Sequence, residues 1–183
     1  AYLERKDTYG KLRKESPRIE SVLADLSARQ LPRVPGTAIF LTADNGSVPH
    51  ALLQNLRHNK VLHQRNVLLT VETVQQPRAD EDERVTVRPV GDGFWRVSVR
   101  FGFMEDPDVP RALVALSIGG ADLVPGDTTY FASSETLVAR KRGGMPPWRD
   151  KLFLLLSRNT VSATEFFRIP GSRLVQLGTQ VEI

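Results

Sequence analysis

The sequence predicts an α/β protein: a mixed sheet with a βαβ parallel core, an antiparallel hairpin, and helices on both faces. Two apolar runs, 37–42 and 66–74, have the length and composition of buried strands, and a segment with helical periodicity separates them. A nine-residue alternation of apolar and polar side chains follows a glycine-rich turn at 91–93. With 40% hydrophobic residues in 183, the chain can bury the core of one domain.

The first predicted helix begins at Ser16-Pro17, a capping residue followed by proline at the first helical position. Four apolar residues at i, i+3, i+4 and i+7 form one stripe that faces a core: Ile19, Val22, Leu23 and Leu26. A segment rich in Lys and Arg precedes this helix. Pro32, Pro35 and Gly36 end it and form a short linker.

The parallel core follows the linker. Thr37–Thr42 is short, apolar and rich in strand formers, as expected of a strand buried on both faces. A helix then carries Leu52, Leu53 and Leu56 and ends near Asn59, and Asn66–Val74 is the second strand. A strand, a helix and a strand joined by short connections make a βαβ unit, so we expect these two strands to be parallel.

An antiparallel hairpin is predicted next. Val85 and Val87 alternate with polar residues, and Gly91-Asp92-Gly93 makes the turn. The return strand begins at Phe94 and places five apolar residues on one face: Trp95, Val97, Val99, Phe101 and Phe103. Arg96, Ser98 and Arg100 lie on the other face, so we expect one face to be buried and the other to be in contact with water.

The remaining elements are shorter or less clearly patterned. Asp108 and Pro110 cap a short helix that bears Leu113 and Leu116. Thr128–Ala132 is a strand, and Trp148–Asn159 is a helix with a broad apolar face. The chain closes with a strand in which Val175, Leu177, Thr179, Val181 and Ile183 share one side. At a sheet edge such a strand would offer unpaired backbone groups to a partner, which predicts a twofold homodimer.

Composition and motifs predict no enzyme. The chain has no cysteine, which excludes disulfides, thiol nucleophiles and cysteine-ligated metals. It contains neither a G-x-S-x-G motif nor a phosphate-binding loop. His50, His58 and His63 do not recur on one helical face, and the acidic run 80–83 is typical of a solvated loop. We therefore expect no catalytic residue, no metal site and no cofactor.

One loop has the position of a ligand site. In open α/β sheets, small ligands bind beyond the carboxyl ends of parallel strands. Asp44, Asn45, Gly46 and Ser47 occupy that place here, and they lead into a helix N-terminus that attracts anions. They are the candidate ligand-binding residues, and the alternative is an ordinary capped turn.

Nucleic acid is not an expected partner. Arg96 and Arg100 beside Phe94 resemble a sheet face that stacks bases. The net charge is only +4, however, with 25 Lys and Arg against 21 Asp and Glu. Most aromatic rings of the strand also fall on the opposite face, where they would belong to the core. No apolar run approaches the roughly 18 residues that span a bilayer, so we expect this part of the chain to be soluble.

The amino-acid sequence resembles the cytosolic C-terminal region of the bacterial KUP/HAK/KT potassium transporters. The resemblance runs in order from Arg33 to Ile183. It is carried by the segments RVPGTAIFLT, VPHALLQNLRHNKVLHQRNVLLTVE, GFWRVSVRFGFMEDPDVPRAL, DTTYFASSETLVAR and GMPPWRDKLFLLLSRNTVSATEFFRIPGSRLVQLGTQVEI. Five collinear segments over most of the chain make a chance match improbable.

The resemblance implies an organisation and a place in the cell. Residues 1–32 would be a basic helical connector from a membrane domain, and 33–183 the cytosolic α/β domain at the cytoplasmic face of the plasma (inner) membrane. The parent would be a potassium:proton symporter whose ion pathway lies in that membrane domain.

The resemblance also implies a role and partners. The expected role is regulatory and dimerising, and the alternative is a nucleotide-sensing domain that gates potassium transport. The expected partners are the transmembrane domain, a second copy of the chain, an anionic lipid surface near the basic N-terminal segment and, in the alternative, a nucleotide.

Overall fold

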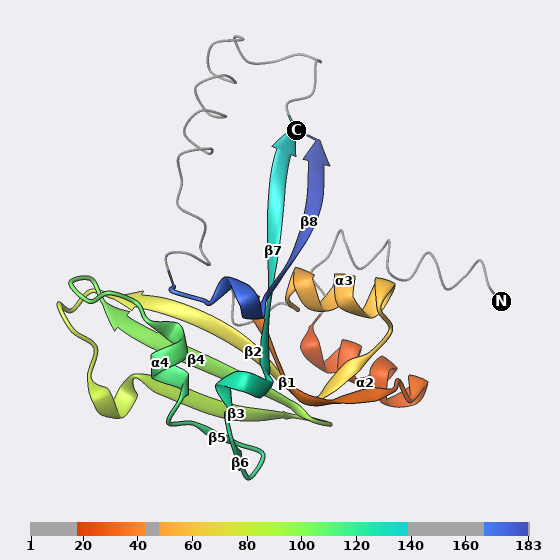
Figure 1. Cartoon of the computed structure of the whole chain (residues 1–183), viewed down its shortest axis with the longest axis horizontal. Helices are drawn as coiled ribbons and strands as arrows, with labels where there is room; N and C mark the ends of the chain where they lie inside the picture. The colour runs from red at the N-terminus through yellow and green to blue at the C-terminus, as the bar shows by residue number, and fades with distance from the viewer. Residues whose placement is uncertain (1–17, 43–47, 139–166, 183) are drawn as a thin grey trace.

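The fold is α/β, with one mixed six-stranded sheet that has helices on both faces (Figure 1). The computed structural model describes residues 18–42, 48–138 and 167–182. The sheet has the order β3-β4-β2-β1-β7-β8, with bounds β1 Arg33–Thr42, β2 Leu62–Val74, β3 Val85–Gly91, β4 Phe94–Gly102, β7 Thr128–Val138 and β8 Leu174–Glu182. A small separate hairpin pairs β5 Ser117–Ile118 with β6 Ala121–Asp122. The helices are α2 Ile19–Arg29, α3 His50–His58 and α4 Val109–Leu113, with 3-10 turns η1 Glu81–Glu83, η2 Pro125–Asp127 and η3 Gly171–Arg173.

The predicted βαβ core is confirmed. β1 and β2 are parallel with α3 between them, and Ala38 pairs with Asn66 and Phe40 with Leu68. β4 adds to the far side of β2, and β7 to the far side of β1, both in parallel. The central residues of β1 are fully buried, as the unbroken apolar run predicts.

α2 and α3 cover one face of the sheet. The predicted stripe of α2 is buried, and it packs with Leu52 and Leu56 of α3 against side chains from four strands: Ala38, Phe40, Leu68, Phe94 and Phe131. Phe40 and Phe131 stack with ring centroids 4.8 Å apart. Burying an aromatic or leucine side chain of this kind contributes about 1.5–3 kcal/mol, so this layer fixes the helices to the sheet.

The opposite face is covered by α4, the small β5–β6 hairpin and the segment before η3. These segments contribute the apolar residues Val109, Leu113, Ile118, Leu123 and Ile169. They pack on the strand side chains that point away from α2 and α3: Ile39, Val67, Leu69, Val97, Val99 and Tyr130. The cap predicted for α4 is present, since the Asp108 carboxylate accepts a hydrogen bond from the Arg111 N–H at 3.0 Å. Alternate side chains of the same strands therefore fill two cores.

The antiparallel hairpin is confirmed, with corrections to its faces. Val97, Val99 and Phe101 are buried, and Trp95 is half-buried against the same cluster. Phe103 is 60% exposed, because β4 ends at Gly102 and Phe103 opens a turn. The face expected to be in water is itself covered at its beginning, where Phe94 is buried beneath the helix layer.

The linker expected at 32–36 is largely strand. β1 begins at Arg33 and pairs with Leu62, four residues before the predicted start of the second strand. The register shifts between Val34 and Thr37, where β1 has one residue more than β2. Proline lacks the N–H that a ladder requires and is found at bulges, so Pro35 interrupts the pairing without ending the strand.

The two ends of the chain differ from the predicted boundaries only in detail. α2 begins at Ile19 with Arg18 as its N-cap, two residues after the predicted start, and Ser16 and Pro17 lie outside the described residues. The helix predicted at Trp148–Asn159 also lies outside them. The terminal strand is confirmed as β8, at one edge of the sheet.

Candidate functional site

The predicted ligand loop borders the carboxyl end of β1. Asp44, Asn45, Gly46 and Ser47 lie outside the described residues, so ligand binding there stays a prediction. The structure describes both flanks. β1 ends at Thr42, and α3 begins at His50 after Pro49, an N-cap that makes no side-chain hydrogen bond.

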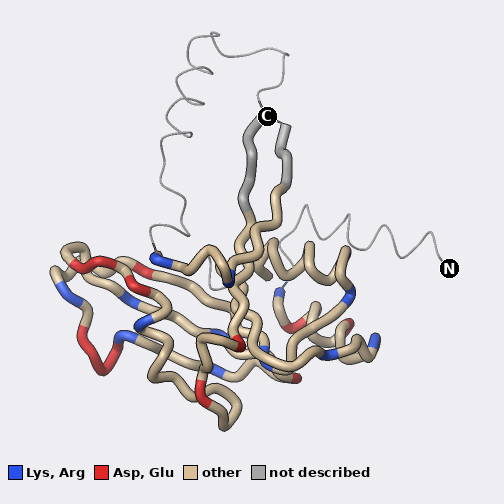
Figure 2. The backbone as a smooth tube through the Cα atoms, viewed as in Figure 1, with Lys and Arg blue, Asp and Glu red and all other residues tan. Residues whose placement is uncertain are grey.

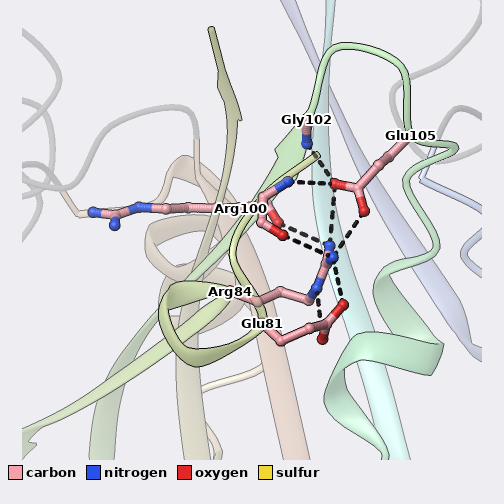
Figure 3. Close-up of polar contacts among 6 residues, drawn as sticks. Glu81, Arg84, Arg100, Gly102 and Glu105 are labelled. Carbon is pink, nitrogen blue, oxygen red and sulfur yellow. Dashed lines mark hydrogen bonds and ion pairs between the residues drawn. The ribbon is translucent and has the colours of Figure 1, made fainter. Parts of the chain in front are cut away.

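A charged cluster joins the carboxyl ends of β2 and β4 (Figure 3). Arg84 donates to Glu105 at 2.8 Å and to Glu81 at 2.8 Å, so its guanidinium lies between two carboxylates. Glu105 also accepts the backbone N–H groups of Ala79 at 3.0 Å and Gly102 at 2.6 Å. We call the Glu81, Arg84 and Glu105 side chains with these two N–H groups the carboxylate clasp.

The surroundings of the clasp keep its groups charged. Hydrogen bonds from Arg84 first, and then from the two backbone N–H groups, lower the pKa of Glu105 to about 2. The bond to Glu105 is the main cause that raises the pKa of Arg84. The hydrogen bond from Arg84 also lowers the pKa of the exposed Glu81 carboxyl. A carboxylate this acidic holds no proton near pH 7, so it is suited to fixing a loop and not to acid–base chemistry.

The clasp was not predicted from the sequence. Arg84 follows the acidic run that we interpreted as a solvated loop, and Glu105 lies 21 residues further along the chain. Glu81 is indeed exposed, with its side chain at 84%, whereas the Arg84 and Glu105 side chains are only 15% and 17% exposed. The available signal was the predicted hairpin, whose register places Arg84 beside Arg100 near the end of β4, but the turn after Gly102 that brings Glu105 back to Arg84 was not predicted.

The described part of the chain contains no cluster of side chains that could bind a metal ion. Within residues 18–42, 48–138 and 167–182, three or more His, Asp or Glu side chains nowhere come together as a metal ion requires. His63 is near Phe131, with ring centroids 5.9 Å apart, and burial is the main cause that lowers its pKa.

A second candidate site is the edge formed by β7 and β8. β7 pairs with β1 only from Thr128 to Phe131, whereas β8 pairs with β7 from Tyr130 to Val138. The two strands therefore leave the sheet together as a parallel ribbon, which Figure 1 shows extending away from the helices. No other described strand pairs with the outer side of β8. This edge offers backbone donors and acceptors to another strand.

The family models assign the class of protein. Residues 35–183 match the model described as the K+ potassium transporter C-terminal domain. The chain therefore belongs to this family of potassium-transporter C-terminal domains, as the resemblance in the sequence implies.

Relatives in three bacteria carry one name. Each is a "Probable potassium transport system protein Kup": 57% identical over 98% of this chain in Xanthomonas oryzae pv. oryzae, 53% over 98% in Xylella fastidiosa (strain Temecula1 / ATCC 700964), and 47% over 94% in Aromatoleum aromaticum. The chain spans 27–28% of the length of these relatives. No solved structure matches.

The relatives are named as transport proteins and not as enzymes. Among the described residues, no helix is long and apolar enough to cross a membrane.

Proposed function

We propose that this chain is the cytosolic domain of a potassium:proton symporter of the plasma membrane, and that it regulates transport by pairing two copies. The observation that carries the transporter role is the 57% identity to a potassium transport protein over 98% of this chain. Because the relatives extend far beyond the matched part, we place the potassium and proton pathway in that remainder. A potassium site needs oxygen ligands that line a pore and replace the hydration shell of the ion.

The pairing proposal rests on the open edge of β8. Isolated two-stranded ribbons are marginally stable in water, and edge strands with free backbone groups readily take another strand. A twofold dimer that joins two β8 strands would extend the sheet across both copies. Tethering of two domains beneath a membrane would raise their local concentration and favour this contact.

A charge on the edge strand tests the pairing. Val175 lies on β8 and is 37% exposed, so Val175→Lys can be made without burying a charge. We expect the 183-residue chain to show twice its single-chain mass by light scattering, and Val175→Lys to show the single-chain mass while keeping a cooperative thermal transition. Val124→Lys is the matched control, because Val124 is 54% exposed and follows β6, outside the six-stranded sheet.

The same variants test the regulatory role in a full-length transporter that carries this domain. Val175→Lys should change the rate of potassium uptake and leave the preference for potassium over sodium intact. A wild-type chain that remains monomeric at millimolar concentration would contradict the pairing proposal. So would a Val175→Lys chain that pairs as well as the Val124→Lys control.

An anionic lipid surface is a further partner in this proposal. The basic segment that precedes α2 would lie against an anionic lipid surface, because such surfaces attract juxtamembrane Lys and Arg. A second candidate function is the sensing of a nucleotide or another phosphate-bearing signal. It is favoured by a surface groove that four arginines line: Arg18, Arg88, Arg96 and Arg100.

A further inference from the structure

A groove of about 710 Å³ lies beside the first turn of α2, over parts of β2, β3 and β4. The first turn of α2 forms one wall, and outward-facing residues of β2, β3 and β4 form the other. Four arginines line it: Arg18, Arg88, Arg96 and Arg100. We call it the arginine groove. Glu20 and Glu72 are its only acidic lining residues in the described part of the chain.

Of the three arginines that β3 and β4 contribute to the arginine groove, only Arg100 forms ion pairs with described carboxylates. Arg100 forms ion pairs with Glu72 at 3.3 Å and with Glu83 at 3.5 Å. Arg88 and Arg96 lie directly opposite each other in the antiparallel β3–β4 pair. Like charges at such positions repel each other. No described carboxylate forms an ion pair with either of them.

Arg96 carries the clearest sign of a missing partner. Its Nη1 atom is buried and has no hydrogen-bond acceptor in the described part of the chain. A buried donor on a charged group costs more when unsatisfied than a neutral one, and proteins rarely leave one without a reason. An anion in the groove would relieve the repulsion between Arg88 and Arg96, and a rotation of the Arg96 guanidinium would bring its buried Nη1 to that acceptor.

The start of α2 adds to the positive potential of the groove. α2 has 11 residues, and its N-cap, Arg18, makes no side-chain hydrogen bond to the free N–H groups of the first turn. These groups carry the positive end of the helix dipole and favour a negative charge nearby. Ile19 and Val90 add apolar side chains to the lining of the groove.

We propose that the arginine groove binds a phosphate-bearing anion, held between Arg88 and Arg96. Side chains that face each other across an antiparallel pair are about 5 Å apart at Cβ, so two guanidinium groups can share one phosphate. Guanidinium also matches phosphate better than lysine does, because its planar donors bind two oxygens at once.

Phosphate recognition fits the groove better than base recognition. Phe94 is only 1% exposed, so no ring of this strand is available to stack a base on the arginine face. Two sources share the chemistry: a free phosphorylated metabolite and the headgroup of an anionic lipid. Figure 2 shows basic positions along the strands of the sheet, whereas the acidic run 80–83 is confined to the loop before β3.

The test uses the full 183-residue chain with one probe for each source. Pyrophosphate is titrated against the isotope-labelled chain while the amide signals of Arg88, Arg96 and Ser98 are followed. Vesicles of phosphatidylcholine, with and without phosphatidylglycerol, are used in co-sedimentation. The variants are Arg88→Gln and Arg96→Gln. Arg111→Gln is the matched control, because it removes the same charge from an exposed position on α4, on the opposite face of the sheet.

We expect saturable binding to at least one probe, weakened about tenfold or more by each groove variant and less than twofold by Arg111→Gln. Binding to pyrophosphate alone identifies a free ligand. Binding to phosphatidylglycerol vesicles identifies a lipid headgroup only where the groove variants weaken it, because the basic segment before α2 would hold the chain on such vesicles without the groove arginines. Failure of both probes overturns the proposal. Equal weakening by all three variants also overturns it, since that would reflect net charge only.

A stability measurement separates a binding role from a structural one. Without an anion, Arg88→Gln should leave the thermal midpoint unchanged or slightly higher, because it removes a repulsion. A large fall in the midpoint would mean that the arginines hold the fold together, which contradicts the proposal. The groove lies at the β3–β4 end of the sheet and β8 at the other edge, so this inference and the proposed pairing can fail separately.

Discussion

Replacing Glu105 with glutamine is the sharpest test of the carboxylate clasp. Glutamine has the same shape but no charge, and its amide nitrogen can only donate. In the clasp every neighbour of Glu105 is itself a donor: two nitrogens of Arg84 and the N–H groups of Ala79 and Gly102. One amide nitrogen of the variant must therefore face a donor, while the guanidinium loses its charged acceptor.

The magnitude follows from the pKa of the carboxyl. Folding lowers the pKa of Glu105 from its usual 4.5 to about 2, so the ionised form stabilises the fold by about 3 kcal/mol at neutral pH. Since the pKa is lower in the folded chain, this contribution is complete above about pH 5 and is lost as the pH falls toward 2. At pH 3 only about 1 kcal/mol is left.

Urea unfolding at pH 7 and pH 3 measures both consequences. We expect Glu105→Gln to lose about 2–3 kcal/mol at pH 7 and to approach the wild type at pH 3. At pH 7 this loss corresponds to roughly 4–12 °C in the thermal midpoint of a chain this size. Asp106→Asn is the neighbouring control, because Asp106 forms an exposed ion pair with Arg168 at 3.2 Å that should contribute under about 1 kcal/mol. A Glu105→Gln chain within 0.5 kcal/mol of the wild type at pH 7, on the order of a neutral surface substitution, would refute the reasoning.

Two further substitutions test how the strands are held. In Gly102→Ala, the new Cβ would overlap the backbone of Pro77 and Arg78, which cannot move aside cheaply, so we expect a loss of about 1–3 kcal/mol in urea unfolding. The fully buried Asn66 side chain accepts a hydrogen bond from the His63 N–H at 3.2 Å and donates one to the His63 carbonyl at 2.7 Å. Asn66→Ala removes both of these hydrogen bonds. We expect a loss of about 2–3 kcal/mol and faster hydrogen exchange at the His63 amide, and unchanged exchange would contradict this role.

Local pattern was enough to predict most elements of the fold. The apolar run in β1 identified a strand buried on both faces, and the stripe of α2 identified the helix face that packs on it. The turn of the hairpin was also predictable, since Asp92 and Gly93 have φ angles of 41° and 76°, which the residues of a two-residue turn must adopt. In each case a few neighbouring residues contain the whole physical reason for the structure.

Errors arose where tertiary contacts override local pattern. Pro35 and Gly36 have the composition of a linker, yet β2 pairs on both sides of them and absorbs the extra residue in a bulge. Phe103 fits the apolar–polar alternation of the β4 sequence, but it is not part of the strand. Glu105 accepts a hydrogen bond from the Gly102 N–H, and the chain turns away from the sheet at that point. Phe94 was assigned to no core because the helices that cover it lie far away in the sequence.

The arginine groove and the clasp depend on contacts between strands that periodicity does not contain. The register of the β3–β4 hairpin places Arg88 opposite Arg96 and Arg84 beside Arg100. The order of the sheet then places β4 next to β2, which brings Glu72 to the groove and the Ala79 N–H to Glu105. With β3 beside β2 instead, the hairpin would still hold Arg88 opposite Arg96, but β4 would be an edge strand and Arg100 would lie away from Glu72. The hairpin register therefore makes the arginine pair, and the strand order decides which neighbouring strand and carboxylate lie beside it.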